Sequence, residues 1–153
     1  MSPTLLVGDK IMVNLKYYNN ANPKRGDIVT YKMPKDPTKI YLHRIIAIGG
    51  DELFIKDKKV YLNNELINES YVTNNDKSIL NESDAPRDNL KKIVIPKNSF
   101  FIMGDNRDNS FDSRFFGVVK FDAIDGKVFF IYLSDNPERI GINFNWYIHQ
   151  EVE

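Results

Sequence analysis

The residues with the greatest chemical capacity lie in one short stretch, residues 100–119, which reads FFIMGDNRDNSFDSRFFGVV. Its middle combines aspartate, asparagine, arginine and serine around one glycine, a composition typical of a solvated loop. Hydrophobic residues flank it on both sides, as strands would. A buried cluster of such groups is tolerable only when its charges satisfy one another. Asp105, Asp112 and Arg114 are therefore expected to satisfy one another through charge-assisted hydrogen bonds.

Other reactive side chains are few. The sequence has no cysteine and two histidines, His43 and His149. The absence of cysteine excludes disulfides, thiolate metal sites and thiol catalysis. Two histidines are too few for a usual zinc site without help from carboxylates. His149 stands apart from every motif described below, and we expect it to be structural.

The bulk composition indicates a globular domain without a charge-driven partner. The chain has 153 residues, of which 42% are apolar and 12% aromatic, so it can bury one well-formed core. Lysine plus arginine equals aspartate plus glutamate at 21 each, so no field of positive charge attracts nucleic acid. No run of about 18 apolar residues, and no hydrophobic segment of a signal peptide, occurs within it.

Short runs rich in valine, isoleucine, tyrosine and phenylalanine alternate with turn signals, a pattern typical of strands. An all-β, mainly antiparallel fold with little helix is predicted. The expected strand regions are 11–18, 27–33, 40–48, 52–67, 91–96, 99–103, 115–119 and 126–134.

The organisation predicted from these runs is a β core with an inserted lobe. Residues 57–67, DKKVYLNNELI, favour a hairpin that turns at the two asparagines. Residues 68–92 have few large apolar side chains and predict a long irregular excursion. Residues 1–55 and 93–153 are therefore assigned to the core and residues 56–92 to the lobe. The tail, residues 136–153, is expected to end in a short helix.

Four Gly-Asp pairs begin at Gly8, Gly26, Gly50 and Gly104. Each alone is explained by turn chemistry. Embedded in longer motifs, however, they resemble type I signal peptidases, the membrane-anchored serine proteases that remove signal peptides from exported preproteins. The first motif of that family, Ser-Met-x-Pro-Thr-Leu-x-x-Gly-Asp, matches Met1 through Asp9 after its serine. Three further matches follow: residues 25–29, residues 44–51, and the fourth motif at Gly104, Asp105, Asn106, Ser110, Asp112, Ser113 and Arg114.

The resemblance implies roles for these residues. It places the polar cluster behind an active site, where it holds the catalytic strands together and orients the base. Ser110 would hydrogen-bond the base. The supporting residues would be Arg44, Asp105, Asn106, Asp112 and Arg114.

Two positions depart from the family pattern. The nucleophilic serine of the first motif would come immediately before Met1, and Ser2 is displaced from that place by two residues, about 6 to 7 Å along a strand. Such a displacement is far outside hydrogen-bonding reach of a base, so Ser2 is expected at the rim of the site. The bacterial enzymes carry their lysine base where this chain has His43, as in the Ser/His endoplasmic-reticulum enzymes. Imidazole titrates near 6.5 and needs no lowered pKa to act as a base; either His43 is a working base or it is a weakened substitute.

The resemblance further implies how substrate binds. A cleavage segment with small residues, Ala-x-Ala, would add as a strand to an exposed sheet edge. Met1, Leu5, Tyr41 and Leu42 would line shallow pockets, with Ser2 beside them. Serine chemistry with a side-chain base needs no metal and no organic cofactor. Residues 1–153 by themselves are predicted to be inactive because they lack the serine.

Signal peptides of preproteins and a membrane surface are the partners that the resemblance implies. The intact protein would carry one N-terminal spanning helix and an extracytoplasmic catalytic domain. The aromatic pairs Phe115-Phe116 and Phe129-Phe130 are candidates for bilayer contact, although one member of such a pair usually belongs to a core.

Three alternatives remain open. A repressor-type autoprotease shares the chemistry, but it would need a scissile segment and a DNA-binding domain, and neither is visible. A conjugation-type maturation peptidase would differ only in substrate. A preprotein-binding paralogue without catalysis would keep the groove and lack the nucleophile.

Overall fold

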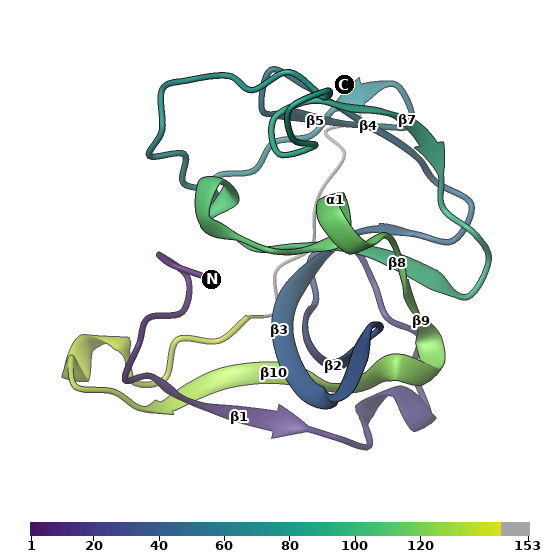
Figure 1. The fold of residues 1–153 in the computed structure, drawn as a ribbon. Helices are drawn as coiled ribbons and strands as arrows, with labels where there is room; N and C mark the ends of the chain where they lie inside the picture. Colours follow the sequence, from purple (N-terminus) through teal and green to yellow (C-terminus); the bar gives the residue numbers. More distant parts are fainter. Residues whose placement is uncertain (145–153) are drawn as a thin grey trace.

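The computed structural model describes residues 1–144 and consists of two antiparallel sheets, confirming the predicted all-β class (Figure 1). The larger sheet has the strand order β1-β10-β2-β3-β8-β9, and the smaller sheet has the order β6-β5-β4-β7. The strands are β1 (Lys10–Asn14), β2 (Ile28–Met33), β3 (Asp36–Ile48), β4 (Glu52–Lys56), β5 (Lys59–Leu62), β6 (Glu65–Leu66), β7 (Leu90–Val94), β8 (Ser99–Met103), β9 (Val119–Lys120) and β10 (Ile124–Leu133). The helical turns are η1 (Tyr17–Asn19), η2 (Arg107–Asn109), α1 (Ser113–Phe116), η3 (Phe121–Ala123) and η4 (Pro137–Arg139).

The hairpin expected in residues 57–67 forms, and its turn explains why. Asn63 and Asn64 join β5 to β6 with φ values of 53° and 71°. Both values lie in the left-handed region, which asparagine tolerates better than most residues and which a two-residue hairpin turn requires. Between β6 and β7 the structure has no further strand of three or more residues, in agreement with an irregular excursion.

Strand β8 explains why so much apolar sequence precedes the polar stretch. All five of its residues are buried. Phe101 and Met103 pack into the core shared with the smaller sheet, whereas Phe100 and Ile102 pack into a second core on the opposite face. The sequence of a strand that is covered on both faces is typically a continuous run of apolar residues.

The strand expected at residues 115–119 is wrong in its first half. Residues 113–116 instead form the single turn α1, and only Val119 enters a strand. The side chain of Asp112 accepts a hydrogen bond from the backbone N–H of Arg114 and caps the turn. Gly117, with φ at 88°, ends it. Local capping therefore overrides the strand propensity of two phenylalanines.

The C-terminal prediction is only partly covered by the described residues. Pro137–Arg139 form the 3₁₀ turn η4, and Phe144 is buried in the third core cluster. The expected end of the tail helix, together with His149, lies outside the described residues. Within residues 1–144, no helix has the length and apolar composition to cross a bilayer.

Candidate active site

His43 lies on β3 at the centre of the site and is 8% exposed. Its Nε2 atom is 3.2 Å from the Ser110 hydroxyl, so the structure brings together the two residues to which the family resemblance gave catalytic roles. Its Nδ1 atom is 2.8 Å from the hydroxyl of Tyr31 on β2. Both ring nitrogens therefore have a hydrogen-bonding partner, and neither partner is Ser2.

Burial lowers the pKa of His43 from 6.5 to about 4. The surrounding charges act in both directions, since Asp112 raises this pKa whereas the Met1 amino group and Arg114 lower it. Removing an ionisable ring from water disfavours its charged form. At neutral pH the imidazole is therefore uncharged, which is the protonation state that a general base needs.

Asp112 is buried and paired with Arg114. Burial raises its pKa, but the Arg114 guanidinium and the Ser110 hydroxyl outweigh burial and hold the pKa below its usual range. Arg114 donates to both carboxylate oxygens at 2.8 Å, and the backbone N–H of Gly104 donates to one of them at 3.0 Å. The carboxylate is thus ionised and fully satisfied in a buried position.

Asp105 belongs to a separate ion pair, which corrects the expectation that Asp105, Asp112 and Arg114 would satisfy one another. The Nε and Nη2 atoms of Arg44 donate to its two oxygens at 2.9 and 2.7 Å. Thr4 also donates its hydroxyl to Asp105. One cluster with a single arginine would leave a buried carboxylate unpaired, so the fold uses one arginine for each.

The residues expected to line substrate pockets divide between two faces. Met1, Leu5 and Leu42 pack together against the third core cluster, whereas Tyr41 packs against the second. Neighbouring residues of a strand point to opposite faces, so Tyr41 and Leu42 cannot line the same wall of one pocket. Ser2 is half-buried beside Met1.

Comparisons with known proteins identify the family of this chain. A sequence model of the family described as "Signal peptidase, peptidase S26" matches residues 1–133. This chain belongs to the type I signal peptidases. It is 34% identical to signal peptidase I of Aquifex aeolicus (strain VF5), over 88% of this chain and 72% of that protein. It is also 34% identical to signal peptidase IB of Staphylococcus aureus (strain COL), over 85% of this chain and 71% of that protein.

A signal peptidase I crystal structure from Enterococcus faecalis V583 resembles the fold with a TM-score of 0.56 and 24% identity. The likeness covers 70% of this chain and 97% of that one. Among residues 1–144, no group of three or more histidine and carboxylate side chains is arranged to hold a metal ion.

Several residues that surround the candidate site escape sequence reasoning. Arg107 donates to Glu69 at 2.8 Å, and the Arg44 guanidinium lies 4.0 Å from the ring centre of Tyr71. Thr73 lies beside Asn106 in an isolated parallel bridge, in which its backbone N–H donates to the Asp105 carbonyl at 2.9 Å and its carbonyl accepts from the Arg107 N–H at 3.1 Å. Glu69, Tyr71 and Thr73 come from a polar segment without periodicity, so only the tertiary structure shows that they cover the site.

The side chain of Asn106 departs from its expected supporting role. Its Oδ1 atom is buried and has no hydrogen-bond partner among the described residues. Its backbone carbonyl, by contrast, accepts a hydrogen bond from the Asn109 N–H at 3.1 Å. The contribution of Asn106 that the structure records is therefore a backbone one.

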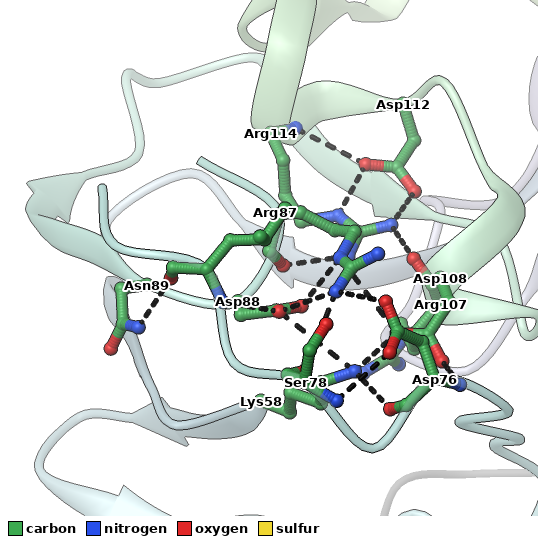
Figure 2. A network of polar contacts seen from close by, with 11 residues as sticks. Lys58, Asp76, Ser78, Arg87, Asp88, Asn89, Arg107, Asp108, Asp112 and Arg114 are labelled. Carbon is green, nitrogen blue, oxygen red and sulfur yellow. Dashed lines mark hydrogen bonds and ion pairs between the residues drawn. The ribbon is translucent and has the colours of Figure 1, made fainter. Parts of the chain in front are cut away.

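A second ionic network ties the excursion to the fourth motif (Figure 2). Lys58 donates to Asp108 at 2.6 Å, and Arg87 donates to Asp88 at 2.8 Å. Arg114 joins this network to Asp112, because its Nη1 atom donates to the Arg87 carbonyl at 2.8 Å. The excursion thereby positions Arg114, and Arg114 in turn binds Asp112.

Gly104 leaves the space that Ser110 occupies. A Cβ atom at residue 104 would overlap the Ser110 hydroxyl and lie 2.8 Å from its Cβ. We expect Gly104→Ala to displace Ser110 from His43 and to lower the free energy of unfolding by about 1–3 kcal/mol, as overpacking does. Urea denaturation and the NMR signals of the His43 ring would measure both effects.

The matched control is Ser110→Gly, which removes both overlapping atoms. The double variant should be more stable than the sum of the two single losses predicts. Strict additivity of the two losses would contradict the steric explanation.

Proposed function

We propose that this chain is the catalytic domain of a signal peptidase that cuts preproteins after Ala-x-Ala-like sites, with His43 as the base. The observation that carries the proposal is the position of Met1. Met1 and Leu42, the neighbour of His43 on β3, pack against the same core cluster, and Nε2 of His43 is 3.2 Å from the Ser110 hydroxyl. A serine in the family position, immediately before Met1, would therefore enter the site from the side on which Leu42 lies.

The sheet offers the edge that substrate binding would need. One edge of β3 pairs with β2 over residues 36–44, and the other edge pairs with β8 only over residues 44–48. Among the described residues, no strand pairs with that second edge at residues 36–43. An extended signal-peptide segment could add there as a strand.

The supporting roles follow from the contacts around His43. Ser110 orients the ring, and the pairs Asp112–Arg114 and Asp105–Arg44 hold the strands that carry it. Met1, Leu5 and Leu42 form one apolar wall near the cut, with Ser2 beside Met1, whereas Tyr41 packs on the opposite face of β3.

Membrane contact is part of the proposal. Met12 on β1 pairs with Phe130 on β10, and these side chains are 45% and 36% exposed. Leu15, directly after β1, and Tyr132 on β10 are also exposed. Such an apolar face at the edge of a sheet suits a bilayer surface beside an N-terminal membrane anchor and an extracytoplasmic domain. Phe116, in contrast, packs against the second core cluster.

The test compares three proteins on one preprotein with an Ala-x-Ala site: residues 1–153, the same chain with serine added before Met1, and that chain with His43→Lys. We expect no cleavage by the first and cleavage by the second, with activity lost below about pH 4 as His43 becomes protonated. Cleavage by the lysine protein alone would show that His43 disables the site.

A preprotein-binding role without catalysis is the second candidate. The low pKa of His43 favours it, because a base is most effective when its pKa lies near the working pH. Binding of the preprotein by all three proteins, with cleavage by none, would support this role over the protease.

A further inference from the structure

Arg139 closes the turn η4, beyond the part of the chain that the family model matches, and it binds the first motif. The pairing of β1 with β10 explains the contact. Lys10 pairs with Leu133, so Asp9, directly before β1, and Ser134, directly after β10, lie side by side. The Ser134 hydroxyl donates to the Asp9 carboxylate at 2.7 Å. The chain then turns back at η4 and brings Arg139 to the same carboxylate (Figure 1).

The guanidinium of Arg139 contacts two residues of the first motif at once. Its Nη2 atom donates to the Asp9 carboxylate at 2.7 Å and to the Thr4 carbonyl at 2.9 Å. Its Nε atom lies 3.1 and 3.2 Å from the two carboxylate oxygens. The side chains of Arg139 and Asp9 are 15% and 2% exposed, so salt screens this pair little. A forked, charge-assisted contact of this kind fixes geometry as well as adding stability.

Thr4 connects this anchor to the strand that carries the base. Its hydroxyl donates to Asp105. Asp105 in turn binds Arg44, which directly follows His43 on β3. Thr4 is therefore held from two sides, with its carbonyl bound to Arg139 and its hydroxyl bound to Asp105.

The remaining hydrogen bonds of the first motif close turns on either side of Thr4. The Leu5 N–H donates to the Met1 carbonyl at 3.1 Å, and the Leu6 N–H donates to the Asp9 carboxylate at 2.8 Å. Strand β1 begins only at residue 10, so no strand pairing holds residues 1–9. The place of Met1 therefore depends on its packing against the third core cluster and on these anchors.

We propose that Arg139 is a positioning residue of the candidate active site, because it fixes residues 1–9 and so sets the place of Met1. Its importance for cleavage rests on the proposed function, in which a serine precedes Met1. A misplacement of about 1 Å between reacting groups can lower a rate about a hundredfold. An arginine that touches neither the substrate nor the base can therefore control the rate.

Amide hydrogen exchange, followed by NMR on residues 1–153, tests the anchor without any activity. In Arg139→Gln, the N–H groups of Leu5 and Leu6 should exchange about tenfold faster than in the unmodified chain, because their turns open locally. The N–H of Ile102, buried on β8 and bonded to the Ser113 hydroxyl at 3.0 Å, reports on global unfolding. An equal increase at all three amides, or none at Leu5 and Leu6, would overturn the proposal.

The matched control is Arg25→Gln. Arg25 forms a similar forked ion pair with Asp51, in the turn between β3 and β4, and the two side chains are 23% and 7% exposed. This variant should change the exchange of Ile102 about as much as Arg139→Gln does and leave the exchange of residues 1–9 unchanged. Faster exchange of residues 1–9 in the control would show that a general loss of stability loosens them, against the proposal.

Kinetics of the serine-extended protein test the consequence for cleavage. At a temperature where all proteins are folded, Arg139→Gln should lower kcat about a hundredfold. KM should rise only a few-fold, because the free edge of β3 still pairs with the substrate. An unchanged kcat would reject the proposal.

Arg139→Lys separates positioning from stability. Lysine keeps the charge opposite Asp9 but lacks the fork that also reaches Thr4. It should therefore restore the urea midpoint more fully than it restores kcat, whereas a kcat that follows the midpoint alone would contradict positioning. If the serine-extended protein with Arg139 intact does not cleave, the proposed function fails, and the exchange rates still decide whether Arg139 anchors residues 1–9.

Discussion

Replacement of Asp105 by asparagine is expected to lower the free energy of unfolding by about 3–5 kcal/mol, the cost of leaving one partner of a buried ion pair alone. Asp105 and Arg44 are 0% and 1% exposed, so water cannot take over the lost interaction. Asparagine keeps the shape of the side chain but replaces one acceptor with a donor that faces Arg44 or Thr4. Since domains are stable by only about 5–15 kcal/mol, a large part of the stability would be lost.

Urea denaturation followed by circular dichroism would measure this loss. The control is Asp36→Asn, which removes an exposed ion pair. In this pair the Asp36 side chain is 39% exposed and the Lys39 side chain is 64% exposed. Exposed pairs contribute little, so the control should keep the midpoint of the unmodified chain. A loss below about 1 kcal/mol for Asp105→Asn would mean that solvent reaches the pair.

The sequence predicts the parts of this fold that depend on local chemistry. Asn63 and Asn64 specify a hairpin because few other residues accept their φ values, and alternating apolar residues specify the strands. The first half of residues 115–119 is mispredicted because one side-chain cap, from Asp112, decides between a strand and a helical turn. A cap of this kind is a single contact and leaves little trace in hydrophobic periodicity.

The site is predictable where a motif names its residues and unpredictable where tertiary contacts choose the partners. Composition suggests that Asp105, Asp112 and Arg114 pair, but it cannot show that Arg44 comes from another strand to bind Asp105. Tyr31 could have been found only from the register of β2 against β3, which depends on the whole sheet. Sequence reasoning therefore identifies the groups but not the directions in which they act.

The stability of the chain is expected to fall as the pH drops from 6.5 to about 4, because folding disfavours the protonated form of His43. The ordinary pKa of 6.5 applies in the unfolded chain, and the folded pKa is about 4, lowered chiefly by burial. Between these values the unfolded state binds more protons than the folded state, so unfolding becomes easier as the pH falls. At about 1.4 kcal/mol per pKa unit, the total loss is about 3 kcal/mol.

The carboxylates around the site act in a different pH range. The pKa of Asp112 is held below its ordinary value of 3.8, chiefly by Arg114 against the opposing effect of burial. Such a group stabilises the fold above its unfolded pKa and loses that contribution only as the pH falls below about 4. The range from pH 4 to 6.5 therefore reports mainly on histidine.

His43→Gln isolates the contribution of this one ring. Urea midpoints measured at half-unit steps from pH 4 to 7 should fall steeply with decreasing pH in the unmodified chain and much less in the variant. His149 is present in both proteins, so its own titration cancels in the comparison. Parallel curves would mean that His43 can be protonated in the folded state without cost. A steep difference would show that the neutral ring, held between Tyr31 and Ser110, is a condition of folding as well as of the proposed chemistry.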